Sequence, residues 1–153
     1  VLIGENRHRD IPNIVFVFDF KKDIEIGRIG IGKAPEQWPY NQDLRSCEFY
    51  VGTVWNFKSF DGNKNSNWPG GGNLASDNTA NDDNDWKLVL TATDIPKETG
   101  IFWYDVPETV SKADRTGRYL KIHPTVGYRG NTPCEIAEIY VDGIVQENTA
   151  NVE

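Results

Sequence analysis

A short segment near residue 40 combines two aromatic side chains with several hydrogen-bonding groups. Residues 33–41 read KAPEQWPYN, so that Trp38 and Tyr40 stand among prolines and polar residues. Sites that bind sugars pair an aromatic platform, which stacks on the apolar face of the ring, with a few fixed polar groups for the hydroxyls. The segment therefore predicts a sugar-binding loop with Trp38 or Tyr40 as the platform. The alternative is that the two aromatic rings only cap the end of the folded core.

A second group of residues is rich in side-chain oxygen. It comprises Asp77, Asn78, Asn81, Asp82, Asp83, Asn84 and Asp85. Calcium takes roughly six to eight oxygen ligands in flexible geometry, and the candidate ligands are Asp82, Asp83 and Asp85. The spacing lacks the EF-hand pattern, and crowded Asp and Asn residues are equally typical of a solvated loop. Calcium is the one cofactor that the sequence suggests.

Motifs for catalysis are missing from the sequence. It contains no GxSxG, no HExxH and no phosphate-binding loop, and its 2 histidines, His8 and His123, are far apart. His123 follows Ile122 and precedes Pro124, which suits a strand end better than a catalytic base. Paired carboxylates for glycoside hydrolysis stay open at this point, because only coordinates show their separation. We expect a domain that is not an enzyme.

Charge and hydropathy restrict the possible partners. The chain of 153 residues holds 23 Asp plus Glu against 16 Lys plus Arg, and this excess repels phosphate backbones and anionic lipids. We therefore expect no nucleic-acid partner. No stretch approaches the roughly 20 apolar residues that cross a bilayer, so membrane insertion is not expected either. Val1 opens the chain without a signal sequence, and we expect a start that has been processed or cut.

The 2 cysteines, Cys47 and Cys134, lie far apart without CxxC spacing or a histidine cluster, which argues against zinc. They form either a disulfide or two buried thiols, and the sequence leaves both open.

Apolar residues recur with period two in short runs bounded by Gly, Pro, Asn and Asp, which is typical of strands. Strands are expected at residues 14–20 and 24–31, then around Cys47, Phe49 and Val51; Trp86, Leu88 and Leu90; Phe102, Tyr104 and Val106; Leu120 and Ile122; and Ala137, Ile139 and Val141. Tyr119, Lys121 and His123 are expected on the outward side. Gly27 separates isoleucines of opposite parity and predicts a bulge that bends the strand. Strands without intervening helices predict an all-β fold, an antiparallel jelly-roll β-sandwich.

Residues 54–85 are rich in Gly, Asn, Asp and Ser and predict a long surface loop within one domain that spans residues 1–153. Its aromatic residues are Trp55, Phe57, Phe60 and Trp68.

Four strings in a fixed order carry a family resemblance: IVFVFDFKKDIEIGRIGIG, CEFYVG, GRYLKI and IAEIYVDG. They resemble the discoidin, or coagulation-factor type C, domains of the galactose-binding-like superfamily, which are similar to family 32 carbohydrate-binding modules. The resemblance covers about residues 14–143. Two features depart from the family: its amino-terminal Asp-Gly-x-x-x-Thr-x-Trp signature is missing before Val1, and the insert after Val54 is long.

The resemblance implies a binding site built from loops at one end of the sandwich. Family members place an Arg and an Asn in the loop after the second strand, and Lys33 and Asn41 stand nearest those places, beside Glu36. The loop before the last strand would add Tyr128, Arg129 and Asn131, and His8 and Arg9 could join from the amino-terminal side. Arg129 could instead be a solvated turn residue. Lys in place of Arg changes a bidentate contact, which puts that contact in doubt.

These observations together predict a noncatalytic carbohydrate-binding module, extracellular, periplasmic or attached to the cell surface, within a longer exported protein. The alternative is an adhesion module that binds a protein, because related domains also bind proteins or phospholipid.

Overall fold

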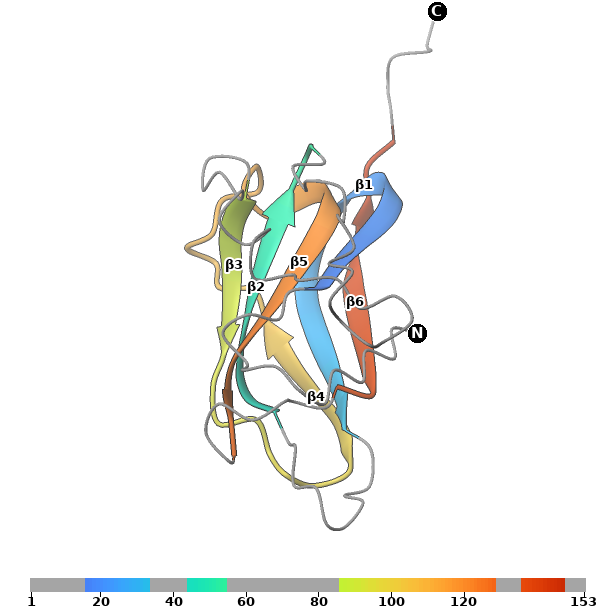
Figure 1. Ribbon diagram of the computed structural model, residues 1–153. Coiled ribbons are helices and arrows are strands. Elements are labelled where there is room, and N and C mark those ends of the chain that lie inside the picture. Colours follow the sequence, from blue (N-terminus) through green and yellow to red (C-terminus); the bar gives the residue numbers. More distant parts are fainter. Residues whose placement is uncertain (1–15, 34–43, 55–85, 129–135, 148–153) are drawn as a thin grey trace, which may run out of the picture.

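The computed structural model describes residues 16–33, 44–54, 86–128 and 136–147. The strands in these segments are β1 (Phe16–Lys33), β2 (Leu44–Gly52), β3 (Trp86–Ala92), β4 (Gly100–Asp105), β5 (Thr116–Gly127) and β6 (Glu138–Val145). All the pairings are antiparallel and follow the order β3-β2-β5-β1-β4, with β6 also paired to β1 (Figure 1). The predicted fold class, an all-β antiparallel sandwich, is confirmed. Within the described segments no helix is long and apolar enough to span a membrane.

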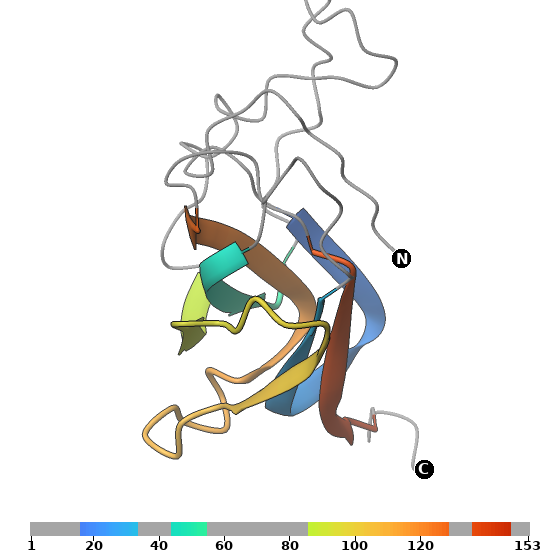
Figure 2. The ribbon, with the colours of Figure 1, turned by 90° about the horizontal axis from the view of Figure 1, so that it is seen from below.

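The 18-residue strand β1 connects the two layers of the sandwich. One layer contains β3, β2 and β5, and the other contains β4 and β6. The first part of β1 pairs with β5, from Phe16 opposite Ile122 to Glu25 opposite Thr116. Its second part pairs with β4 on one side and with β6 on the other. The sheet therefore curls round its own core, as the end view in Figure 2 shows.

Two irregularities bend β1 between the layers. The register against β6 shifts between Ile26 and Arg28, so Gly27 is the bulge residue that the change of parity predicted. The register against β5 shifts between Asp19 and Ile24, where Lys21 has a φ of 64°. Each extra residue increases the local twist, which turns the second part of β1 toward the other layer.

The core lies between the two layers and is apolar. Its largest fully buried side chains include Phe49, Ile26, Ile29, Ile31, Leu120 and Ile122. The predicted alternation along β2 is confirmed, because Cys47, Phe49 and Val51 are buried and join this core. Burial of such side chains contributes roughly 1.5–3 kcal/mol each.

The alternation predicted for β3 is wrong at one position. Leu88 is 47% exposed, whereas Val89 is only 1% exposed and belongs to the core. The cause is a bulge: Phe49 pairs with Leu90 but Tyr50 pairs with Leu88, which leaves Val89 as the extra residue. A bulge reverses the parity between the residues on its two sides, so Trp86 lies on the same outward side as Leu88, where it is nevertheless only 3% exposed.

Tyr119 and Lys121 have the predicted outward parity on β5, yet both are buried. Tyr119 and Lys121 are 8% and 7% exposed. The Lys121 ammonium lies 4.4 Å from the centre of the Tyr50 ring and 5.0 Å from that of Trp86. A cation above aromatic rings lets a lysine bury its long stem, which alternation of polar and apolar types does not anticipate.

Candidate functional site

The strand ends that border the two predicted loops meet at one end of the sandwich, the lower end in Figure 1. β1 ends at Lys33, and Leu44 at the start of β2 pairs with Gly127 at the end of β5. The segment after Lys33 and the segment after Tyr128 therefore begin close together. This convergence is what the family resemblance implied for a loop-built site.

Lys33 is placed inside this end. It follows Ile29 and Ile31 on the inward parity of β1, is 5% exposed, and its ammonium donates to the Leu44 carbonyl oxygen at 3.1 Å. The side chain thus ties the end of β1 to the start of β2. A direct contact between Lys33 and a ligand stays a prediction.

Tyr128 is held from its hydroxyl end. The hydroxyl donates to the Ile95 carbonyl oxygen at 2.7 Å, which fixes the direction of the ring. Three cationic groups surround the ring, with Lys97 Nζ at 5.2 Å, the Arg45 guanidinium at 5.8 Å and Lys33 Nζ at 6.0 Å from its centre. Tyr128 and Lys33, both predicted on separate loops, are therefore brought together.

Arg45 and Lys97 are residues that the sequence reasoning missed. Arg45 binds Asp94 Oδ1 through Nε at 3.2 Å and Nη2 at 3.1 Å, and its carbonyl accepts the Ile95 amide at 3.0 Å. This double contact fastens the turn after β3 to the start of β2, with Asp94 at a φ of 51°. Burial, together with the nearby Tyr128 and Asp94, raises the pKa of Tyr104. The sequence offered one signal for Arg45, its alternation with the buried Leu44. This alternation predicts that the Arg45 side chain points outward, but it does not identify Asp94 or Tyr128 as its contacts.

The other predicted binding residues, Glu36, Trp38, Tyr40, Asn41, Arg129 and Asn131, lie outside the described residues. The same holds for the calcium candidates Asp82, Asp83 and Asp85, for the insert, for His8 and Arg9, and for Cys134. Cys47 is buried in the core, and the disulfide stays a prediction. In the parts of the chain that the structure covers, no group of three or more His, Cys, Asp or Glu residues could hold a metal ion.

A polar cluster crosses from β2 to β5 on the outward face. The Tyr50 hydroxyl donates to Glu48 Oε2 at 2.6 Å, and His123 Nδ1 lies 3.3 Å from the same oxygen. Glu48 pairs with His123 across the strands, so one carboxylate aligns two side chains on neighbouring strands. The side chain of His123 is 27% exposed, in keeping with the expected outward position.

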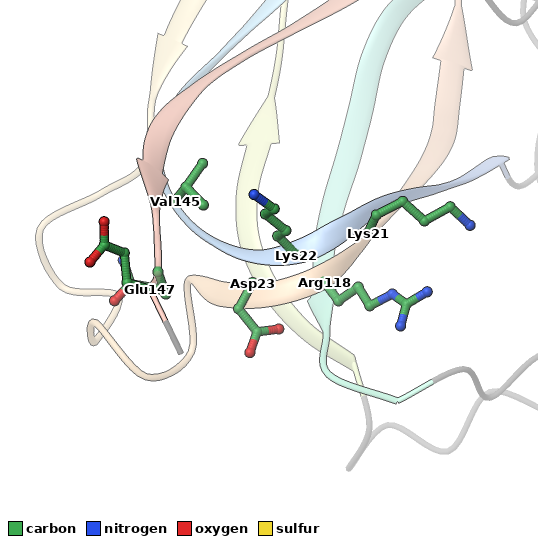
Figure 3. Close-up of a pocket in the computed structure, with 7 residues that line it drawn as sticks. Lys21, Lys22, Asp23, Arg118, Val145 and Glu147 are labelled. Carbon is green, nitrogen blue, oxygen red and sulfur yellow. The ribbon is translucent and has the colours of Figure 1, made fainter. Parts of the chain in front are cut away.

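A pocket of about 580 Å³ lies at the other end of the sandwich, beside the irregularity of β1 between Asp19 and Ile24 (Figure 3). It is lined by Lys21, Lys22, Asp23, Arg118, Val145, Gln146 and Glu147. Arg118 binds Asp19 through two nitrogens at 2.7 and 2.9 Å, and the Lys21 ammonium binds the same carboxylate at 2.7 Å. Two of the cationic groups of the pocket thus already share one carboxylate of the protein, which makes the pocket a weaker candidate than the end that carries Tyr128.

Comparison with known proteins gives structural similarity only. No family model matches the chain, and no curated protein matches it in sequence. The fold is similar to the C-terminal domain of a chitobiase from Bacteroides fragilis, with a TM-score of 0.53 and 16% identity over 87% of this chain and 64% of that one. A fragment of a putative chitobiase from Bacteroides thetaiotaomicron matches with a TM-score of 0.46 and 17% identity, over 88% of this chain and 62% of that one. The chain therefore spans less than two thirds of each neighbour, and at such identity the first likeness shows a shared all-β fold.

Proposed function

We propose that this domain is a noncatalytic carbohydrate-binding module of the galactose-binding-like kind, similar to discoidin domains. The observation that carries the proposal is the convergence of Lys33 and Tyr128 at the end where the two predicted loops begin. A sugar site needs polar groups held in fixed directions, and Tyr128 is fixed by its hydrogen bond to Ile95. The fold neighbour from Bacteroides fragilis is a domain of a chitobiase, which fits a role beside glycan chemistry.

The same proposal extends to the setting of the domain. A module of this kind works within a longer exported protein, outside the cell or at its surface, and holds that protein on its glycan. The predicted loop residues Trp38 and Tyr40 supply the stacking platform, and Asn41, Glu36 and Arg129 supply polar contacts.

A glycan array followed by calorimetry tests this function, with an assay of product release on every glycan that binds. We expect saturable binding without turnover. Trp38→Ala or Tyr40→Ala should weaken binding about tenfold to a hundredfold at an unchanged melting temperature, because a stacking platform is worth on the order of 1–2.5 kcal/mol. Trp68→Ala, in the insert, is the control.

Three results would contradict the proposal in different ways. Turnover of a bound glycan would make the domain an enzyme. Saturable binding of an extracellular protein, with no glycan bound, would favour the adhesion module. Loss of binding only in Trp68→Ala would move the site into the insert.

A further inference from the structure

The outward face of the layer β4-β1-β6 carries an unusual set of residues. Across these strands Arg28 pairs with Asp105 and Asp142, Gly30 with Trp103 and Tyr140, and Gly32 with Ile101 and Glu138. The central strand thus presents two glycines between flanking strands that carry large or charged side chains. At these two positions the central strand therefore has no side chain of its own.

The indole of Trp103 lies over one of these glycines, Gly30. A Cβ built on Gly30 would stand 3.1 Å from Cδ2, Cε2 and Cε3 of Trp103. Equal distances to three adjoining ring atoms place that position over the face of the six-membered ring rather than at its edge. The indole therefore rests flat on Gly30, and the residue is still 42% exposed.

Polar and aromatic neighbours hold the indole in place. The Tyr140 ring stands 6.0 Å away at 48° to it, and the Tyr140 hydroxyl is bound to the Glu138 carboxylate. The Arg28 guanidinium lies over the indole, 4.4 Å from its centre, and is tied to Asp142 at 2.8 Å, so it covers part of the ring face that Gly30 leaves free. Because these partners are themselves paired, the indole loses little conformational freedom when a ligand stacks on it.

From this arrangement we infer that the face β4-β1-β6 is a second saccharide-binding surface, with Trp103 as its platform. The 42% of Trp103 that stays exposed beside the guanidinium suits the apolar face of a pyranose ring, and the guanidinium and carboxylates around it suit hydroxyl groups. A protein partner would need a broad apolar centre, whereas here Arg28, Asp105, Asp142 and Glu138 lie among the exposed side chains of Trp103, Tyr140 and Ile101. The inference rests on the proposed glycan-binding function but places a second site away from the loops.

The charges of this surface restrict the sugar that it takes. Among the described residues in these paired rows, the acidic residues are Asp105, Glu138 and Asp142 and the basic residue is Arg28, so this part of the surface carries more negative than positive charge. Glycans with uronate or sulfate groups are repelled by such a surface, whereas uncharged chains are not. The ligand class is an uncharged oligosaccharide laid across the three strands.

The experiment compares variants by calorimetry with uncharged and anionic probes. The uncharged probes are chito-, cello- and manno-oligosaccharides, the anionic probe is oligogalacturonate, and the variants are Trp103→Ala, Trp103→Tyr and Leu88→Ala. We expect Trp103→Ala to weaken binding of an uncharged probe about tenfold and Trp103→Tyr to retain most of it. Leu88 is 47% exposed on β3, so Leu88→Ala is the control for loss of an exposed apolar side chain.

A second measurement does not depend on the stability of Trp103→Ala. In protein that contains 5-fluorotryptophan, Trp103→Tyr identifies the fluorine resonance of Trp103, which should shift as the uncharged probe saturates. If Trp38→Ala abolishes binding while the Trp103 resonance and the Trp103→Ala affinity stay unchanged, the second surface is refuted and the proposed function stands. If none of the uncharged probes binds the wild type, the second surface as stated is refuted, and the glycan array tests the proposed function separately. Equal binding of oligogalacturonate at Trp103 would refute the stated ligand class.

Discussion

The indole of Trp103 rests on Gly30, the residue opposite it in the β1–β4 register. A glycine in the middle of a strand weakens the strand, because it packs no side chain and orders a more flexible backbone. Here the missing side chain makes room for a ring from the neighbouring strand. The pair therefore explains both an interior glycine and an exposed tryptophan.

Gly30→Ala should lift the indole without unfolding the domain. The new methyl group would stand 3.1 Å from the ring, closer than an ordinary contact, and the exposed ring can move outward. Acrylamide quenching of Trp103 fluorescence, taken as the difference from a Trp103→Phe background, should increase. The matched control is Gly27→Ala, whose methyl group would lie 3.5 Å from the Asp142 carbonyl oxygen, an ordinary contact. Equal quenching in both variants would show that the indole does not rest on Gly30.

Gly117→Ala should be far more damaging than Gly30→Ala. A Cβ at Gly117 would stand 2.5 Å from the Gly52 carbonyl oxygen and 2.7 Å from Val51 Cγ1. Backbone cannot swing away as a side chain can, so β2 and β5 would have to separate. Overpacking of this kind costs about 1–3 kcal/mol, and urea unfolding measures it as a lower midpoint. A wild-type midpoint would mean that the two strands have space between them.

Much of this fold could be predicted from the sequence, because burial and strand parity are local signals. The change of parity around Gly27 identified the bulge, and the alternation of Cys47, Phe49 and Val51 identified the inward face of β2. The burial of Val89 could not be predicted, because valine as a residue type does not indicate a bulge. The burial of Lys121 could not be predicted either, because it depends on aromatic rings that come from two other strands.

The candidate sites were harder to predict for the same reason. Tyr128 could be placed near the end of the strand β5 from the order of the family-like strings. Arg45 and Lys97 could not, because their relation to the Tyr128 ring depends on a turn that is distant in sequence. Trp103 lay on the outward parity opposite Phe102 and Tyr104, yet only the register that places Gly30 beside it distinguishes a platform from an ordinary strand residue.

The bulge in β3 gives a prediction about two neighbouring residues. Val89→Ala removes core methyl groups and should lower the free energy of unfolding by about 1–2.5 kcal/mol, whereas Leu88→Ala should change it by less than about 0.5 kcal/mol. The simple alternation of Trp86, Leu88 and Leu90 would give the opposite order. Urea unfolding of the two variants, each compared with wild type, decides between them.

The ion pair between Asp19 and Arg118 should make stability depend on acid pH. Arg118 donates to both carboxylate oxygens of Asp19, and Lys21 adds its ammonium, so these bonds hold the pKa of Asp19 well below its usual range. A carboxyl group whose pKa is lowered by folding stabilises the native state above its unfolded pKa of about 3.9, and this stabilisation is lost as the pH falls below that value. The wild type should therefore lose more of its unfolding midpoint between about pH 4 and pH 2 than Asp19→Asn does.

Arg118→Lys provides the matched comparison for this ion pair. It keeps the positive charge but cannot make the two-point contact with Asp19, so its pH dependence should fall between those of wild type and Asp19→Asn. The side chains of Asp19 and Arg118 are 21% and 40% exposed, so salt should weaken the effect in part rather than abolish it. Urea midpoints measured at steps of half a pH unit, at low and high salt, test both statements. Parallel curves for the wild type and Asp19→Asn would contradict this prediction. They would mean that the pKa of Asp19 is the same in the unfolded chain as in the native protein, so that the ion pair does not contribute to the pH dependence of stability.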